Sequence, residues 1–374
     1  MLLRKTLLTV AASAVLAAGC ATATPRPLSL ALPAAARDKI ASTDVVMSIP
    51  QKEIFFYDQA VGGGATYVPV YTPVSTGMSS GAAATAGIVG LLLVAGIAAA
   101  QAADEASDLK PLREAMDKFA LDEALRTEMK TASAQSAWLK ANEPKVLKQP
   151  KQEEVDAAVT SSAASGVMVV NTSYTINSNG DEITMAITPT FYATSPDLKA
   201  VLPPDPSKSK SKPTSKPKPV AATDPLNQIY YNTFTFRTQV PNGVTGRRET
   251  NIAAWVANDA ANLKAAMTMG SAKLAQMLVA DLETPTAPVD PKTTTLRPIN
   301  AELVNGHVLR NDADGQVVLL PTGTQVYLAN STLEPLQKAG PDPEKKLSAR
   351  ERAKLQKEQE KAAKEAKKKA KGST

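Results

Sequence analysis

Residues 167–192 read VMVVNTSYTINSNGDEITMAITPTFY, and this stretch decides the fold that the sequence predicts. Apolar and polar residues alternate in its second half, which is the period of a half-buried β-strand. Asn179-Gly180 lies between the two runs and suits the tight reversal of a hairpin. The stretch therefore predicts an antiparallel hairpin with strands at 167–176 and 182–192.

Helical patterns stand on both sides of this hairpin. The upstream pattern predicts an amphipathic helix pair that ends near Trp138 and Leu139, and the downstream pattern predicts a long helix capped by Asn258 or Asp259. The apolar positions are Leu109, Leu112, Met116, Phe119, Leu121, Leu125 and Met129 in the pair and Leu263, Met267, Leu274, Leu278 and Leu282 in the long helix.

Shorter strands complete the predicted fold. They are expected at 44–49, 54–57, 229–240, 306–310, 316–320 and 324–328. The order of strands and helices predicts the α+β class: a small antiparallel sheet with two or three packed helices, and a Gly/Ala-rich apolar helix besides.

The charge of the chain is concentrated in its tail. The 374 residues carry a formal net charge of +6, and residues 344–371 alone hold 12 Lys or Arg and 5 Glu. Aromatic residues make up 4% of the chain, which predicts a modest core. Since the basic surplus lies in one segment, and the N-terminus predicts export, nucleic acid is not expected as a partner.

The N-terminus has the features of an export signal. Arg4 and Lys5 precede an apolar run, residues 6–18, which is too short to span a bilayer permanently. The run ends in Leu16-Ala17-Ala18-Gly19-Cys20, which resembles the lipobox of bacterial lipoproteins, with Ala17 where that family prefers Leu. The resemblance implies removal of residues 1–19 and attachment of fatty acyl chains to Cys20. The alternative is ordinary cleavage after Ala23, which would release a soluble periplasmic protein.

Cys20 is the chain's single cysteine, so it has no partner for a disulfide within the chain. Two or three acyl chains would hold the protein in the membrane almost permanently. Ala21 follows the cysteine where inner-membrane lipoproteins carry Asp, and the resemblance therefore implies the periplasmic side of the outer membrane rather than the inner membrane.

Residues 81–103 form an uncharged run rich in Gly and Ala. Three placements are open for this predicted helix: a membrane span, burial in the folded domain, or self-association through a stripe of small residues. Burial or membrane contact is favoured over a full span, because the strongly apolar centre covers only residues 88–97.

Two lysine-rich segments are predicted to be disordered or solvated. Residues 203–219 read PPDPSKSKSKPTSKPKP, and residues 341–374 are rich in Lys, Ala and Glu. Both could bind anionic lipid or the cell-wall polymer, although charge runs are usually only solvated.

These features divide the chain into seven parts. They are a signal peptide (1–19), a lipidated tether (20–43), short strands and a loop (44–80), the apolar helix (81–103), an α+β domain (104–290) with the insertion 203–219, a small β-meander (291–340) and the basic tail (341–374).

One catalytic motif is present in the sequence. Gly77-Met78-Ser79-Ser80-Gly81 fits the G-x-S-x-G nucleophile elbow, and Asp281 and His307 follow in the order of a hydrolase triad. The preceding segment contains Pro69 and Pro73, which do not suit the strand that this motif requires. A serine hydrolase using Ser79 and His307 is therefore the least favoured function.

Metal and cofactor sites are not expected. A single histidine leaves few ligands for zinc. Asp312-Ala-Asp-Gly315 is interpreted as a turn, because an EF-hand register would put Arg310 and Pro321 at positions that need carboxylates.

The middle of the chain is loosely similar to uncharacterised proteobacterial cell-envelope lipoproteins. The matching pieces are the Gly/Ala-rich run, residues 108–115 (DLKPLREA), residues 229–236 (IYYNTFTF) and residues 255–259 (WVAND). The resemblance implies no established activity. The sequence therefore predicts a non-enzymatic binding or assembly component of the envelope, with a membrane-assembly or pore component that uses residues 81–103 as the alternative.

Overall fold

The structure is a computed structural model that describes residues 29–57, 108–202, 223, 227–285, 295–299, 302–320 and 323–333. The side chains of residue 57 and of residues 295–299 and 302–305 are outside this description. The chain divides into two compact units, Met1–Gln337 and Lys338–Thr374, and every described residue belongs to the first.

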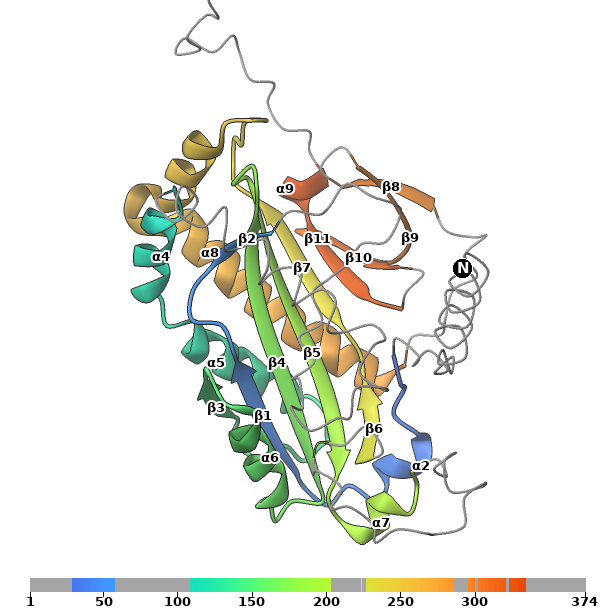
Figure 1. Cartoon of the computed structure of the whole chain (residues 1–374). Coiled ribbons are helices and arrows are strands. Elements are labelled where there is room, and N and C mark those ends of the chain that lie inside the picture. Colours follow the sequence, from blue (N-terminus) through green and yellow to red (C-terminus); the bar gives the residue numbers. More distant parts are fainter. Residues whose placement is uncertain are drawn as a thin grey trace, which may run out of the picture. The chain divides into compact units, whose positions relative to one another are not determined.

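The eleven strands of the described residues form one mixed sheet in the order β3-β1-β4-β5-β7-β11-β10-β9-β8 (Figure 1). Two further strands pair with the central strands: β2 pairs with β4, and β6 pairs with β5. The strands are β1 (Thr43–Ile49), β2 (Phe55–Tyr57), β3 (Lys145–Lys148), β4 (Gly166–Asn177), β5 (Glu182–Ala193), β6 (Gln228–Tyr231), β7 (Phe234–Gln239), β8 (Thr295–Ile299), β9 (Glu302–Asp312), β10 (Gly315–Leu319) and β11 (Gln325–Ala329).

The predicted hairpin is confirmed as β4 and β5, which pair antiparallel along their length. The side-chain Oδ1 of Asn177 accepts hydrogen bonds from the backbone N–H groups of Asp181 (3.0 Å) and Glu182 (3.2 Å) and closes the turn. Gly180 has a φ of +68°, and a Cβ there would lie 3.2 Å from the Arg248 carbonyl oxygen. The turn therefore needs glycine for its backbone and for the space beside Arg248.

Pro189 within β5 is tolerated because the strand pairing beside it is interrupted between β6 and β7. β6 and β7 lie end to end along β5, with Asn232 and Thr233 between them. The Asn232 N–H donates to the Pro189 carbonyl at 3.3 Å, which places that side of Pro189 at the break. The N–H and C=O of a residue in an extended strand point to the same side, so the donor that proline lacks would face this interruption.

The predicted α+β class, with a small antiparallel sheet and two or three packed helices, is wrong, because the described residues form a mixed α/β fold with one large sheet of parallel and antiparallel strands and seven helices. β1 pairs in parallel with β3 and β4, β2 pairs in parallel with β4, and β11 pairs in parallel with β7. Parallel neighbours need long crossovers, and the helices that precede β4 and β11 supply them. The prediction joined strands that were neighbours in sequence, whereas these pairs are distant in it.

The strands expected at 306–310, 316–320 and 324–328 are present as β9, β10 and β11. They extend the main sheet through the pairing of β11 with β7, whereas the sequence suggested a separate small meander. Residues 30–43, assigned to the tether, also belong to the described fold, because Leu30 and Tyr231 exchange backbone hydrogen bonds (2.8 and 3.1 Å).

Helices cover the sheet on both faces. They are α2 (Ala34–Arg37), α4 (Lys110–Asp117), α5 (Leu121–Ser133), α6 (Gln152–Thr160), α7 (Pro196–Lys199), α8 (Arg248–Glu283) and α9 (Asn330–Leu333). The main core joins α4, α5 and α8 to Met168 and Val170 of β4, whereas α6 packs on Val167 and Val169. Because successive side chains of a strand point to opposite faces, α6 lies on the face opposite α8.

The apolar faces predicted for the helices are buried, and Leu263, Met267, Leu274, Leu278 and Leu282 of α8 are each 0% exposed. α8 contains a break, because Ala257 to Ala260 are non-helical and Asn258, Asp259 and Ala260 have positive φ. The sequence placed a helix cap at Asn258 or Asp259, and the break falls at these residues. The Asn262 amide donates to the Ala254 carbonyl at 2.9 Å and joins the two halves.

α8 approaches the sheet most closely at Gly270. A Cβ at this position would lie 2.5 Å from Met185 Sδ and 2.9 Å from Phe236 Cδ1. We expect Gly270→Val to lower the free energy of unfolding by about 1–3 kcal/mol, because overpacking at this contact outweighs the gain of about 0.5 kcal/mol in helix propensity. Urea unfolding followed by circular dichroism measures this change. Ala265→Val, at an exposed position of the same helix, should cost about 0.5 kcal/mol, and an equal loss in both variants would contradict the close contact.

Candidate functional site

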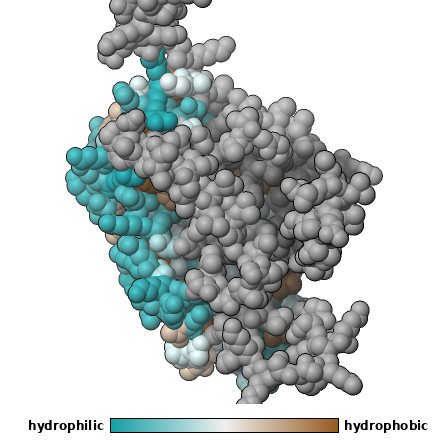
Figure 2. Space-filling model, viewed as in Figure 1, coloured by the Kyte–Doolittle hydropathy of each residue, from teal (hydrophilic) through white to brown (hydrophobic). Residues whose placement is uncertain are grey.

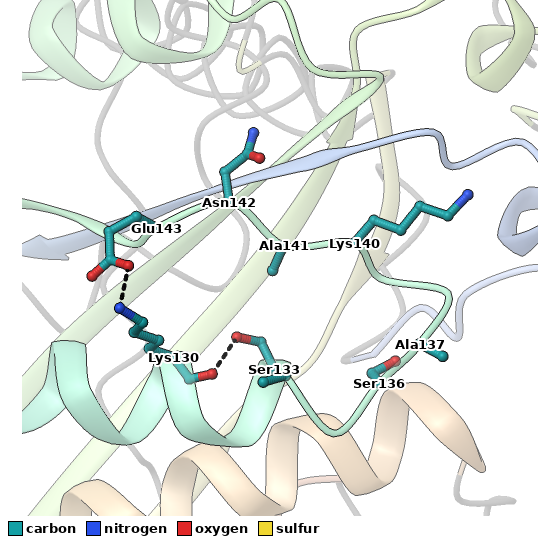
Figure 3. A pocket seen from close by; sticks show the side chains of 9 residues that line it. Lys130, Ser133, Ser136, Ala137, Lys140, Ala141, Asn142 and Glu143 are labelled. Carbon is teal, nitrogen blue, oxygen red and sulfur yellow. Dashed lines mark hydrogen bonds and ion pairs between the residues drawn. The ribbon is translucent and has the colours of Figure 1, made fainter.

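The described surface has a hollow of about 330 Å³ between the last turn of α5 and the loop that leads to β3 (Figure 3). It is lined by residues of the Lys130–Ala134 turn and of the loop 136–143. Figure 2 shows hydrophilic side chains gathered over the edge of the fold that carries α4, α5, β3 and α6. The hollow therefore lies in a polar surface.

The polar side chains around the hollow already have partners. Lys130 Nζ lies 2.6 Å from Glu143 Oε2, and Ser133 Oγ lies 3.3 Å from the Lys130 carbonyl oxygen (Figure 3). Ser133 Oγ also donates to the Met129 carbonyl at 2.6 Å. Lys140 Nζ donates to the Ile40 carbonyl at 3.2 Å. The Ser133 hydroxyl proton is donated to the carbonyl groups of its own helix, so this arrangement suits contact with a small polar group better than nucleophilic chemistry.

A side chain that connects two helices, here called a structural joint, lies beside the hollow. Arg37 of α2 donates from Nη2 to the Glu283 carbonyl at 2.9 Å and to the Leu282 carbonyl, at the C-terminal end of α8. Its guanidinium carbon lies 5.2 Å from the centre of the Trp138 ring. Helix ends leave carbonyl groups without partners and carry partial negative charge, so a cation at this place stabilises α8.

A second joint surrounds Asp281, which is 5% exposed. Its Oδ2 accepts hydrogen bonds from Tyr230 OH and Asn232 Nδ2 (both 3.0 Å), and its Oδ1 accepts one from Gln325 Nε2 (2.8 Å). Burial raises the pKa of Tyr230 well above its ordinary value, and the nearby Asp281 carboxylate adds to the rise. One carboxylate thus connects the last turns of α8 to β6, to the break before β7 and to β11.

The residues of the predicted triad have different surroundings. Asp281 is engaged by the three donors above, and His307 is exposed on β9, where it pairs with Leu319 of β10. Ser79 lies outside the described residues. The contacts of Asp281 therefore define a structural role for the residue that the hydrolase hypothesis used as its acid.

The Asp312–Gly315 turn is held by ion pairs. Arg310 donates to Asp312 from Nε (2.6 Å) and Nη2 (3.0 Å), and Lys273 Nζ lies 2.8 Å from Asp314 Oδ1. Hydrogen bonds from Arg310 and Lys273 lower the pKa values of Asp312 and Asp314, respectively, below the ordinary range. The two carboxylates are thus matched by two cations, which agrees with the interpretation of this segment as a turn.

Two acidic residues at the start of β5 have different environments. Arg237 Nε donates to Glu182 Oε1 at 2.7 Å in a buried pair. Asp181 is 1% exposed, and among the described residues its carboxylate oxygens accept no hydrogen bond. Burial raises the pKa of Asp181, and the Asn177 side chain and the charge of Arg237 offset part of the rise.

Several expected features lie outside the described residues: Cys20, Ser79, the run 81–103, the insertion 203–219 and the tail 341–374. Within the described ranges, no three His, Cys, Asp or Glu side chains are grouped so as to hold a metal ion. The same ranges contain no helix with the length and apolarity that a membrane span requires.

Comparisons with protein-family models, with curated proteins and with solved structures find no significant match to this chain.

Sequence reasoning missed the joints, although a signal for one of them was present. Asp281 stands seven residues after Leu274 and three after Leu278, which puts it on the buried face of α8. A carboxylate on an apolar helix face predicts buried hydrogen-bond donors from a neighbouring element. Arg37 had no such signal, because its partners are backbone carbonyl groups far away in the sequence.

We expect Asp281→Ala to lower the free energy of unfolding by about 2–4 kcal/mol, because three buried donors lose their acceptor. Chemical denaturation of the purified variant tests this, with Asp197→Ala, at an exposed position of α7, as the control that should change stability by less than about 0.5 kcal/mol. Unchanged stability in Asp281→Ala would show that the carboxylate does not join these elements.

Asp181→Asn should stabilise the fold at neutral pH. The raised pKa means that burial disfavours the ionised carboxylate, and the amide removes this cost. The advantage should shrink as the pH falls through the folded-state pKa, and it should vanish below the ordinary carboxyl range, where Asp181 is protonated in both states. Urea midpoints measured from pH 4 to pH 8 follow the trend, with Asp197→Asn as the exposed control. A gain in stability that does not depend on pH would contradict this explanation.

Proposed function

We propose that this chain is a cell-envelope lipoprotein that is held in a membrane by lipid on Cys20 and acts by binding or assembly. The proposal for the anchor is supported by the charged, apolar and lipobox segments at residues 1–20. The described fold begins at Ser29, so only eight residues separate it from Cys20. This spacing fits a domain that is displayed directly at a membrane surface.

One observation supports binding over catalysis: the polar groups of the described residues connect secondary-structure elements. The Asp281 carboxylate joins α8 to β6, to β11 and to the break between β6 and β7, Arg37 joins α2 to α8, and Lys273 joins α8 to the turn before β10. Acid–base and nucleophilic catalysis requires accessible side chains whose pKa values suit the reaction. The described residues instead resemble a rigid scaffold on which surface features are presented.

The polar edge of the fold is the candidate contact surface. Its lysines and carboxylates form ion pairs, such as Lys130 with Glu143 (2.6 Å) and Lys148 with Asp122 (2.7 Å). Paired exposed charges contribute little to stability but fix a pattern that a partner surface can match. A protein or polymer with both signs of charge is the class of partner that this edge suits.

Metabolic labelling with an alkyne fatty acid tests the anchor. The wild-type chain should be labelled and should float with membranes, because two or three acyl chains hold a protein almost permanently. Cys20→Ser should lose both properties. A labelled Cys20→Ser variant, or a wild-type chain without label, would contradict the lipoprotein proposal.

The same preparations test the choice between binding and catalysis. A fluorophosphonate probe marks activated serines, and the binding proposal expects no label that depends on Ser79. Labelling of the wild type that disappears in Ser79→Ala would replace the proposal with the hydrolase alternative.

A further inference from the structure

The N-terminal part of the described fold is joined to one end of the sheet. Leu30 pairs with Tyr231 of β6, and Ser165 Oγ accepts hydrogen bonds from the backbone of Ala41 (2.9 Å) and Ser42 (3.1 Å). Ser165 also receives the Thr194 N–H at its carbonyl (3.1 Å), just before α7. Residues 30–42, α7 and β6 therefore meet at one end of the sheet, here named the anchor end (Figure 1).

The Asn177–Asp181 turn forms the opposite end of the same hairpin. Leu30 pairs with Tyr231, which pairs with Thr190 of β5. Eleven steps along the chain lead from Asn179 to Thr190, and a strand rises about 3.3 Å per step, so the turn lies about 36 Å from the anchor end. Trp255 Nε1 donates to the Gly180 carbonyl at 2.9 Å and holds the turn against α8.

The length of chain between Cys20 and the fold limits how the domain sits on a membrane. The ten steps from Cys20 to Leu30 span at most about 36 Å when fully extended, whereas a flexible chain of this length averages about 17 Å. The average is about half of the distance of about 36 Å between the two ends of the hairpin. An upright domain with the turn at the membrane and Leu30 pointing away would therefore need a fully extended tether, so the short tether favours the anchor end at the surface.

The charge of the neighbouring sequence favours the same arrangement. Residues 203–219 follow Leu202, which comes shortly after α7, and they precede Thr223 and β6. The stretch contains five Lys and one Asp. Each lysine close to an anionic membrane contributes about 1 kcal/mol of attraction. This basic segment therefore follows the anchor end in the chain. The described chain resumes at Thr223, which accepts a hydrogen bond from Gln152 Nε2 (3.2 Å) and donates one to Asp156 of α6, and it then enters β6.

We propose that the anchor end faces a lipid surface with anionic headgroups and that the Asn177–Asp181 turn points away from it. The proposal rests on the lipid anchor at Cys20 proposed above. The domain then has a membrane-facing end, which consists of residues 30–42, α7 and β6. Its distal end consists of the hairpin turn and the first half of α8.

Energy transfer to labelled lipid headgroups tests the orientation. Lys199→Cys at the anchor end and Asn179→Cys at the turn are both exposed positions, and each would carry the same donor dye. Cys20 does not react with the dye, because its sulfur is in the thioether to the lipid. The full lipidated chain is reconstituted into vesicles of phosphatidylcholine and phosphatidylglycerol with an acceptor on the headgroups. Transfer should be about twofold or more higher from residue 199, given a separation of about 36 Å.

A longer tether provides the matched control. Insertion of about 20 Gly and Ser residues after Leu28 should lower transfer from residue 199 toward that from residue 179, because the tether would then exceed the length of the hairpin. Equal transfer from both positions with the natural tether, or higher transfer from residue 179, overturns the orientation. If the wild-type chain does not float with the vesicles, the anchor is wrong and the orientation falls with it. If the chain floats and transfer is equal, only the orientation is wrong.

Discussion

The close approach of α8 to the sheet at Gly270 is the constraint on which the rest of the fold depends. The missing side chain lets the helix rest on Met185 of β5 and Phe236 of β7. α8 is the helix in the long connection between β7 and β11, which pair in parallel. The same helix then contacts the hairpin turn through Trp255 and the opposite end of the sheet through Asp281.

Buried polar groups mark the places where elements of different origin meet. Asp281 accepts hydrogen bonds from donors on β6, on β11 and in the break between β6 and β7, so its desolvation is offset by hydrogen bonds that exist only in the folded chain. Asp181 is as deeply buried, and among the described residues its carboxylate oxygens accept no hydrogen bond. The two residues show that burial of a carboxylate does not by itself indicate a functional site. A buried carboxylate that accepts hydrogen bonds from several elements connects them, whereas one that accepts none lowers the stability of the fold.

The sequence predicted the parts of the fold that depend on neighbours in the chain. The β4–β5 hairpin, the α4–α5 pair and the apolar face of α8 follow from periodicity and from the Asn-Gly turn. The parallel pairing of β1 with β4 and of β11 with β7 joins distant segments, and periodicity carries no information about it. The candidate site was predicted less well, because Arg37 and Asp281 act through partners that only the folded chain brings near. Chain order made Asp281 a candidate for a triad, although its spacing from Leu274 and Leu278 indicates the buried face of α8.

The lysine-rich segments carry a basic surplus that the rest of the chain lacks. Residues 203–219 and 344–371 together hold 17 of the 42 Lys and Arg but only 6 of the 36 Asp and Glu, which leaves 25 basic and 30 acidic residues elsewhere. The remainder of the chain is therefore mildly acidic and would be repelled by anionic headgroups within about 10 Å at ordinary salt. In the proposed orientation, the lysines of residues 203–219, which follow the membrane-facing end in the chain, would offset this repulsion. The paired charges of the polar edge produce little field at a distance, so recognition there depends on short-range fit rather than on net charge.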